Sequence, residues 1–224
     1  MTRMTPAQRR EEIVNATVTV MLRKGIAGTT ARDVAEQMGT SSGLIHHYFM
    51  SMDDLLAAAF DRAAGQDLDV TRTAMATVAA PVARLGTFFA TYARAEQTWA
   101  FQLWLDAWAE ASRRPAVQVT SRRLNVAWQR LLADTIRAGV AAGEVSCTDP
   151  EATAWRILCL LDGLALQVVA HAGAIDRHHV IGWSLVYAER ELGLAPGALG
   201  AAPEDALAPR SAPVGPEYQG AVAT

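Results

Sequence analysis

Small hydroxyl side chains and imidazoles gather in residues 29–49, which read TTARDVAEQMGTSSGLIHHYF. We expect this stretch to form two short helices joined by a tight turn. The second helix would bury Ile45, Tyr48 and Phe49 and leave the other side of its amino-terminal half exposed. The residues on that outer side are Ser41, Ser42, Leu44, His46 and His47. A short helix with such a face suits insertion into the major groove of DNA.

Local signals position both short helices. Thr30 lies three residues before Asp33, the spacing of a capping box, and would begin the first helix. Gly39 would end that helix in the left-handed conformation, and Ser41 or Ser42 would cap the second helix. Capping alone explains Thr30 and Asp33, so a DNA contact would be an additional role for Thr30.

Backbone N–H groups at the amino-terminal ends of both helices would bind phosphates. Side chains of Ser42, Leu44 and His47 would reach base edges, where Leu44 can contact only a thymine methyl group or a sugar. The complete predicted DNA-contact set is Thr30, Arg32, Ser41, Ser42, Gly43, Leu44, His46, His47 and Tyr48. Adjacent helical residues point about 100° apart, so we do not expect His46 and His47 to form a metal site.

Composition and charge restrict the class of protein. The chain has 224 residues, is 51% hydrophobic and carries a net charge of −3, which is a globular composition. Residues 1–50 carry +2 and the rest −5, so only the amino-terminal part suits nucleic acid. Cys147 and Cys159 suggest neither a disulfide framework nor a metal cluster, and we place Cys159 in the core. Without a signal peptide or an unbroken membrane-length apolar run, we expect a soluble, cytoplasmic protein.

About nine helices account for the chain up to residue 194, which predicts an all-α fold. Thr5, Pro6 and Gln8 would open the first helix, and Gly25 would end it. With the two short helices it would form a helix-turn-helix DNA-binding head at 1–50. A long helix at 51–76 would link this head to a helical ligand-binding and dimerisation domain at 51–194. Its further helices would start at Pro81, cover 98–112 and about 116–142, and start again after Asp149 and Asp176.

The last two helices are too apolar for the surface of a monomer. Gly163 and Ala165 would allow another helix to approach closely. We therefore expect two copies of the chain to pair through these helices as a four-helix bundle. Beyond them, residues 195–224 are rich in Ala, Pro and Gly, and we expect a disordered tail.

Aromatic residues are concentrated in the body of the chain. A ligand pocket there would be lined by Phe89, Tyr92, Trp104, Trp108, Trp128 and Asp162, with Phe88 and Trp99 as further candidates. Burial in the core explains any one of these aromatic side chains, but together they could form a cage for a quaternary or polyamine cation. A flat hydrophobic or acyl ligand is an equal alternative. Asp162, on an apolar helix, needs a partner, which would be Arg156, Gln129 or a ligand.

The chain resembles the TetR/AcrR family of bacterial transcriptional regulators in the order and spacing of Thr29, Thr30, Arg32, Asp33, Val34, Ala35, Gly39, Ser41, Gly43, Tyr48, Phe49 and Ser51. Residues 161–166 look family-like, and residues 104–115 are similar to the BetI-type subgroup. The resemblance implies a homodimer that binds a palindromic operator, usually as a repressor, until a small molecule in the body releases it. We expect the helix at 51–76 to carry this change, because it is the covalent link to the head.

Three positions depart from the pattern of the family. His46 stands where the family usually has Tyr, and Met50 and Met52 stand where it often has Pro and Lys. An imidazole can still donate one hydrogen bond to a phosphate. The thioether of Met52 cannot, so one phosphate contact should be missing.

No catalytic pattern competes with this interpretation. The chain has no Ser-His-Asp order, Gly-rich phosphate loop or metal-ligand spacing, so we expect neither an enzyme nor a cofactor. His171, His178 and His179 would be solvated or interface residues. The alternatives to a ligand-released repressor are a ligand-independent DNA-binding regulator, a helical enzyme, and a dimerisation scaffold with a vestigial head.

Overall fold

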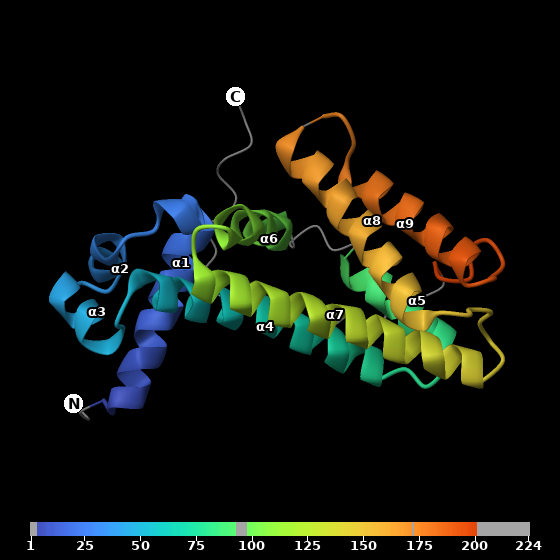
Figure 1. Cartoon of the computed structure of the whole chain (residues 1–224), viewed down its shortest axis with the longest axis horizontal. Coiled ribbons are helices and arrows are strands. Elements are labelled where there is room, and N and C mark those ends of the chain that lie inside the picture. Colours follow the sequence, from blue (N-terminus) through green and yellow to red (C-terminus); the bar gives the residue numbers. More distant parts are fainter. Residues whose placement is uncertain (1–3, 93–97, 172, 201–224) are drawn as a thin grey trace. The chain divides into compact units, whose positions relative to one another are not determined.

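The computed structural model describes residues 4–92, 98–171 and 173–200 (Figure 1). Within these residues the chain forms nine α-helices and no β-strand, which confirms the predicted all-α fold. The helices are α1 (Pro6–Gly28), α2 (Ala31–Gln37), α3 (Ser42–Tyr48), α4 (Met52–Ala76), α5 (Pro81–Tyr92), α6 (Thr98–Ala111), α7 (Pro115–Ala141), α8 (Pro150–Ala170) and α9 (Arg177–Glu191).

The described residues fold as two compact units. The first unit comprises residues 4–66 and 102–124, and the second comprises residues 67–92, 98–101, 125–171 and 173–200. The division falls within α4, α6 and α7. The helix-turn-helix head therefore shares its unit with the first part of α4, most of α6 and the start of α7.

Helix α1 begins as its sequence predicts. Thr5 Oγ1 accepts a hydrogen bond from Gln8 N (3.2 Å), and Gln8 Oε1 accepts one from Thr5 N (2.8 Å), which completes a capping box. Gly25 interrupts the helix with a φ of +76°, a conformation that is strained for residues with a side chain. The predicted end at Gly25 is therefore a break, after which one further turn runs to Gly28.

A small apolar core holds the helix-turn-helix together. Its buried members come from α1, α2, α3, the residue after α3 and α4. They are Ile13, Val14, Val20, Val34, Ala35, Ile45, Phe49 and Leu55. Gly39 takes a φ of +63° directly after Met38, so it ends α2 as predicted. The predicted inner residue Tyr48 is only partly buried against this core.

The first half of α4 is fastened to α7 within the first unit. Asp53 Oδ2 accepts a hydrogen bond from Ala116 N (3.0 Å), so a residue of α4 caps the amino terminus of α7. Two turns further on, Asp61 Oδ1 lies 2.5 Å from Arg123 Nη2. The other oxygen of Asp53, Oδ1, is buried and has no hydrogen-bond partner among the described residues.

Helices α8 and α9 of the second unit form an antiparallel hairpin (Figure 1). Asp149 caps α8 and Asp176 caps α9, as predicted, because each carboxylate accepts a hydrogen bond from the backbone N–H three residues later (3.0 Å in both). Arg156 Nη2 lies 2.7 Å from Glu191 Oε2, which joins the start of α8 to the end of α9.

Two details of the second unit differ from the prediction. Cys159 is exposed, so its predicted place in the core is wrong for the single chain. Residues 195–200, the start of the predicted tail, are folded: the Glu189 carboxylate accepts hydrogen bonds from Gly197 N and Leu199 N (3.0 Å each), and Leu199 is 1% exposed. The rest of the predicted tail, residues 201–224, lies outside the described residues.

Helix α8 differs from the sequence-based expectation in one further respect. It is the one helix of the described residues that is long and apolar enough to cross a membrane by length and composition. The core or interface helices of water-soluble proteins meet the same criterion.

Candidate nucleic-acid interface and ligand site

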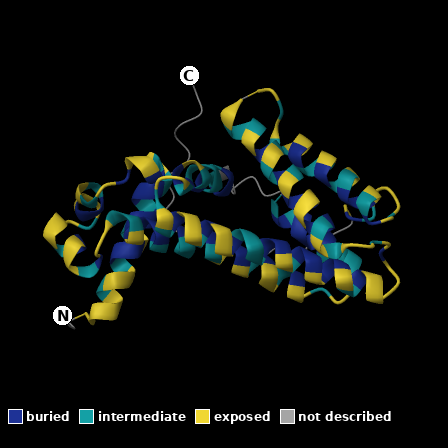
Figure 2. Cartoon of the chain, viewed as in Figure 1, coloured by how far each residue is buried: buried dark blue, intermediate teal, exposed yellow. Residues whose placement is uncertain are grey.

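Helix α3 presents the predicted outer face to solvent (Figure 2). The exposed residues of this face are Ser41, Ser42, Gly43, His46 and His47. Leu44 is half-buried, and Ile45 on the opposite side is buried in the head core. Ser41 is the N-cap residue, but its side chain does not make the capping hydrogen bond that the sequence suggested. The α3 face thus combines free backbone N–H groups with small polar side chains, a combination that suits a groove of DNA.

Hydrogen bonds and one ion pair engage the side chains at the amino terminus of α2. Thr30 Oγ1 accepts a hydrogen bond from Asp33 N (3.2 Å) and donates one to Asp33 Oδ2 (2.7 Å), so the predicted capping box is present. Lys24 Nζ adds an ion pair to the same carboxylate. Hydrogen bonds from Lys24 and Thr30 lower the pKa of Asp33 to about 2. A DNA contact by the Thr30 hydroxyl would have to coexist with this cap, whereas Arg32 is exposed.

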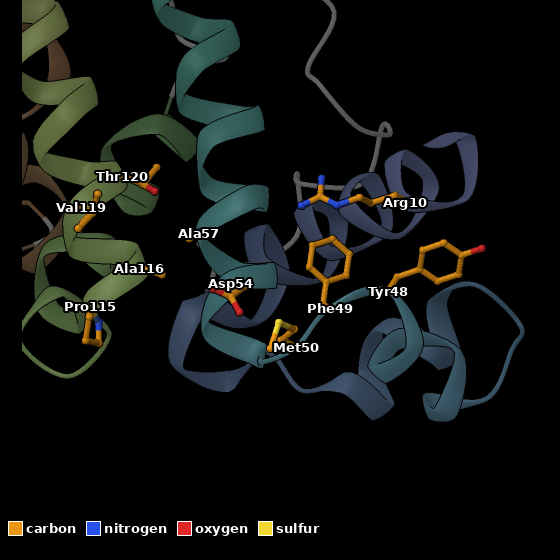
Figure 3. Close-up of a pocket in the computed structure, with 10 residues that line it drawn as sticks. All are labelled: Arg10, Tyr48, Phe49, Met50, Asp54, Ala57, Pro115, Ala116, Val119 and Thr120. Carbon is orange, nitrogen blue, oxygen red and sulfur yellow. The ribbon is translucent and has the colours of Figure 1, made fainter. Parts of the chain in front are cut away.

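A surface pocket adjoins the end of α3. It has a volume of about 630 Å³ and is lined by Arg10, Tyr48, Phe49, Met50, Asp54, Ala57, Pro115, Ala116, Val119 and Thr120, all in the first unit (Figure 3). The Arg10 guanidinium lies over the Phe49 ring, 4.6 Å from its centroid. Tyr48 meets the His47 ring edge-on at 5.1 Å. None of the predicted ligand-binding residues lines this pocket.

The six predicted ligand-binding residues do not all belong to one unit. Trp104 and Trp108 are in the first unit, where their ring centroids lie 5.6 Å apart and Trp104 packs edge-on against Phe60. The other four, Phe89, Tyr92, Trp128 and Asp162, are in the second unit. Phe89 is almost fully buried beside Phe88, which favours a core role for this residue.

An aromatic cluster surrounds Tyr92 in the second unit. The centroid of the Tyr92 ring lies 5.7 Å from that of Trp128 and 6.4 Å from that of Phe101. Arg177 donates two hydrogen bonds to the Tyr92 carbonyl (2.8 and 3.1 Å) and stacks over Phe101 at 4.8 Å. Trp128 Nε1 is buried without a hydrogen-bond partner among the described residues. Phe101 and Arg177 were not predicted, because no local pattern links them to Tyr92.

Asp162 contributes the carboxylate of this cluster. Burial raises the pKa of Asp162 to about 7. Burial and the charges of Asp162 and Asp67 raise the pKa of Tyr92. The predicted internal partners are engaged elsewhere: Arg156 pairs with Glu191, and Gln129 Nε2 donates to the Glu151 carbonyl (3.2 Å). The predicted Arg156 and Gln129 pairings are therefore wrong, and a desolvated carboxyl group lies close to an aromatic cluster.

Histidines and cysteines do not assemble a metal site in the described part of the chain. No group of three or more His, Cys, Asp or Glu side chains there could hold a metal ion. His179 instead completes the capping box of α9, with Nδ1 2.8 Å from Asp176 Oδ1, and its ring lies against Trp183.

Family models match both parts of the chain. Residues 13–59 match the model described as bacterial regulatory proteins, tetR family. Residues 81–193 match the model described as BetI-type transcriptional repressor, C-terminal. The HTH-type transcriptional regulator BetI of Paraburkholderia phytofirmans is 32% identical over 171 residues, covering 71% of this chain and 80% of the relative. BetI of Rhizobium meliloti is 30% identical over 161 residues, and the match covers 71% of this chain and 77% of the relative.

Solved structures share the fold. A putative transcriptional regulator from Saccharomonospora viridis, in complex with choline, superposes with a TM-score of 0.75 at 24% identity and covers 83% of this chain and 98% of that one. A putative transcriptional regulator from Pseudomonas aeruginosa PAO1 superposes with a TM-score of 0.71 at 26% identity, and the match covers 84% of this chain and 92% of that one. The chain therefore belongs to the TetR family, with a BetI-type carboxyl-terminal domain, and is a helix-turn-helix transcriptional regulator and not an enzyme.

Proposed function

We propose that the protein is a cytoplasmic, homodimeric repressor that leaves a palindromic operator when its carboxyl-terminal domain binds a small cation. The exposed polar face of α3, built on the buried head core, is the observation that carries the proposal. In a symmetric dimer two copies of this face would enter successive major grooves about 34–36 Å apart. A change in their separation of a few ångströms would weaken binding.

Base contacts come from Ser42, Leu44 and His47 in this proposal. Half-buried Leu44 offers only an apolar contact, which suits a thymine methyl group. Arg32, His46 and the amino-terminal N–H groups of α3 bind phosphates. Tyr48 packs on the head core and supports the exposed His47 ring.

The dimer forms through exposed apolar residues along α8 and α9, which together form an apolar stripe. The stripe on α8 contains Trp155 and Leu166, which are 37% and 41% exposed, and that on α9 contains Trp183 and Val186, which are 49% and 48% exposed. Cys159 and Gly163 continue the α8 stripe at helical spacing, and a Cβ atom on Gly163 would meet nothing within 4 Å. Large apolar side chains in a continuous stripe favour burial against a second copy.

The Tyr92 cluster suits a quaternary ammonium ligand. Tyr92 and Trp128 offer aromatic faces, which attract cations, and Asp162 offers a carboxylate. The neighbouring Phe101 ring already carries one cation of the chain, the Arg177 guanidinium. A bound cation would replace the proton that burial favours on Asp162 at neutral pH. The choline complex of the Saccharomonospora viridis regulator supports this class of ligand.

The experiment starts from a DNA duplex that the wild-type protein enriches from a randomised pool. Replacing one exposed arginine of the head, Arg32→Ala, should weaken binding about tenfold and make the salt slope shallower by about one unit. Arg72→Ala, which removes an exposed guanidinium from the second unit, is the matched control and should change neither. Equal binding by wild type and by Arg32→Ala and His47→Ala would contradict this DNA interface.

The proposed release from DNA by a bound cation is tested by adding choline to the protein bound to the same duplex. Choline should weaken DNA binding by the wild-type protein, and 3,3-dimethylbutan-1-ol, a neutral molecule of the same shape, should not. Asp162→Asn should reduce the choline response. An identical response to the charged and the neutral compound would exclude a cation site, and no response to either would favour ligand-independent regulation.

A further inference from the structure

Asp106 on α6 lies at the break in α1. Its Oδ2 atom is 3.0 Å from the position of a Cβ atom on Gly25, and its carboxylate accepts a hydrogen bond from the backbone N–H of Ile26. The other oxygen, Oδ1, accepts a hydrogen bond from Gln102 Nε2 (3.0 Å). All four residues belong to the first unit.

The break at Gly25 creates the need for such an acceptor. A residue with positive φ ends the regular helical hydrogen bonding, so the turn after it starts with N–H groups that lack intrahelical partners. Ile26 is fully buried, where water cannot replace a missing partner. Asp106 therefore caps the last turn of α1 from a different helix. Burial raises the pKa of Asp106 even though Gln102 and Ile26 both donate to it, so the carboxyl group is held there against a desolvation penalty.

The capped turn leads directly into the helix-turn-helix. Thr29 Oγ1 donates a hydrogen bond to the Gly25 carbonyl (2.7 Å), and Thr29 is almost fully buried. The next residue, Thr30, is the N-cap of α2. A short series of hydrogen bonds thus runs from Asp106 in α6, through the break at Gly25, to the first turn of α2.

We propose that Asp106 is a positioning residue for DNA binding, which fixes the place of α2 and α3 by capping the broken end of α1. Helix α6 is continuous with residues 98–101 of the second unit, where Arg177 and Tyr92 contact Phe101. A shift of α6 along its axis would move this carboxylate and, with it, the capped turn of α1. The inference rests on the proposed DNA-binding function.

The first test measures affinity for the duplex selected by the wild-type protein. Asp106→Ala should weaken binding about tenfold, because the head would occupy its binding-competent position less often. Asp106→Asn should stay within about threefold of wild type, because its amide oxygen can accept the same hydrogen bond. Asp61→Asn, which removes an exposed carboxylate of the same unit from its pair with Arg123, is the control and should stay within about twofold.

The second test measures amide hydrogen exchange without DNA. Asp106→Ala should speed exchange at Ile26 while leaving the amides of α8 unchanged, which separates a local opening from general unfolding. Gly25→Ala should also speed exchange at Ile26, because a Cβ atom at this position would crowd the Asp106 carboxylate and because the positive φ of Gly25 strains a residue with a side chain.

The two proposals fail in different ways. If the wild-type protein enriches no duplex, the DNA-binding proposal fails, while exchange at Ile26 still tests the cap. If Asp106→Ala binds the duplex as wild type does, or if Asp61→Asn weakens binding equally, the positioning role is overturned. Unchanged exchange at Ile26 in Asp106→Ala overturns the cap itself.

Discussion

Lys24 Nζ lies 2.5 Å from Asp33 Oδ1, and this ion pair joins the last residue before the break in α1 to the first turn of α2. The other oxygen of Asp33 bonds Thr30, so one carboxylate serves both the helix cap and the contact between helices. The orientation of the first helix of the DNA-binding motif therefore depends on a charge that low pH removes.

The first prediction concerns acid. The folded pKa of Asp33, about 2, lies below its ordinary value of 3.8, so its bonds stabilise the head above pH 4 and are lost as the pH falls from 4 to 2. Asp33→Asn should speed hydrogen exchange in α2 at pH 7, and the difference from wild type should shrink towards pH 2. Asp69→Asn, at an exposed pair in the second unit, should leave α2 unchanged. Equal exchange in wild type and Asp33→Asn at pH 7 would contradict the role of this carboxylate.

The second prediction restores a phosphate contact. Met52 is the first residue of α4 and is half-buried, and a lysine there could extend its ammonium group to solvent. Met52→Lys should tighten operator binding at low salt and make the slope of log affinity against log salt steeper by about 0.9. Val140→Lys adds the same charge to an exposed site in the second unit. A gain of equal size in both variants would indicate a general effect of charge and not a contact.

The third prediction concerns Asp162. Its folded pKa of about 7 exceeds the ordinary value of 3.8, so the folded state binds more protons than the unfolded state between pH 4 and 7, and stability falls as the pH rises through that window. Asp162→Asn should raise the free energy of unfolding at pH 8 by on the order of 2 kcal/mol, a gain that disappears near pH 4. Chemical unfolding of both proteins at pH 8 and at pH 4 measures this difference in the free energy of unfolding. Asp134→Asn, at an exposed pair on α7, should show no such pH-dependent gain.

The fourth prediction concerns the stripe on α8 and α9. Leu166→Glu should weaken the dimer by about a hundredfold or more, because a two-fold axis places the new charge and its copy in one apolar interface. Sedimentation analysis over a range of protein concentrations measures the change. Val140→Glu alters an apolar residue of similar exposure on α7 and should remain dimeric. A dimer that tolerates Leu166→Glu would place the interface on another surface.

Local sequence signals account for most of the helix ends. The caps at Thr5, Thr30, Asp149 and Asp176 and the positive φ of Gly39 all depend on residues within a few positions of one another. A capping box or a left-handed glycine needs no tertiary context, so the sequence alone is enough to predict it.

Contacts between distant residues could not be predicted in this way. Asp106 accepts a hydrogen bond from Ile26 because α6 packs in the same unit as the end of α1. Asp53 accepts one from Ala116 because the first parts of α4 and α7 pack in that unit as well. Helical periodicity also does not separate a core face from an exposed face that suits a partner, which is why Cys159 was placed in the core. The aromatic residues of α6 belong to different units, Phe101 to the second and Trp104 and Trp108 to the first, and nothing in their spacing along the helix indicates this division.

The hydrogen bonds between Glu189 and residues 197–199 determine where the chain can be shortened. Glu189 is 5% exposed, and its two donors lie beyond the end of α9. Cutting after Leu194 would leave a buried carboxylate without them, at a penalty on the order of 3 kcal/mol. Truncation after Leu194 should therefore destabilise the second unit, whereas truncation after Gly200 would keep both hydrogen-bond donors of Glu189.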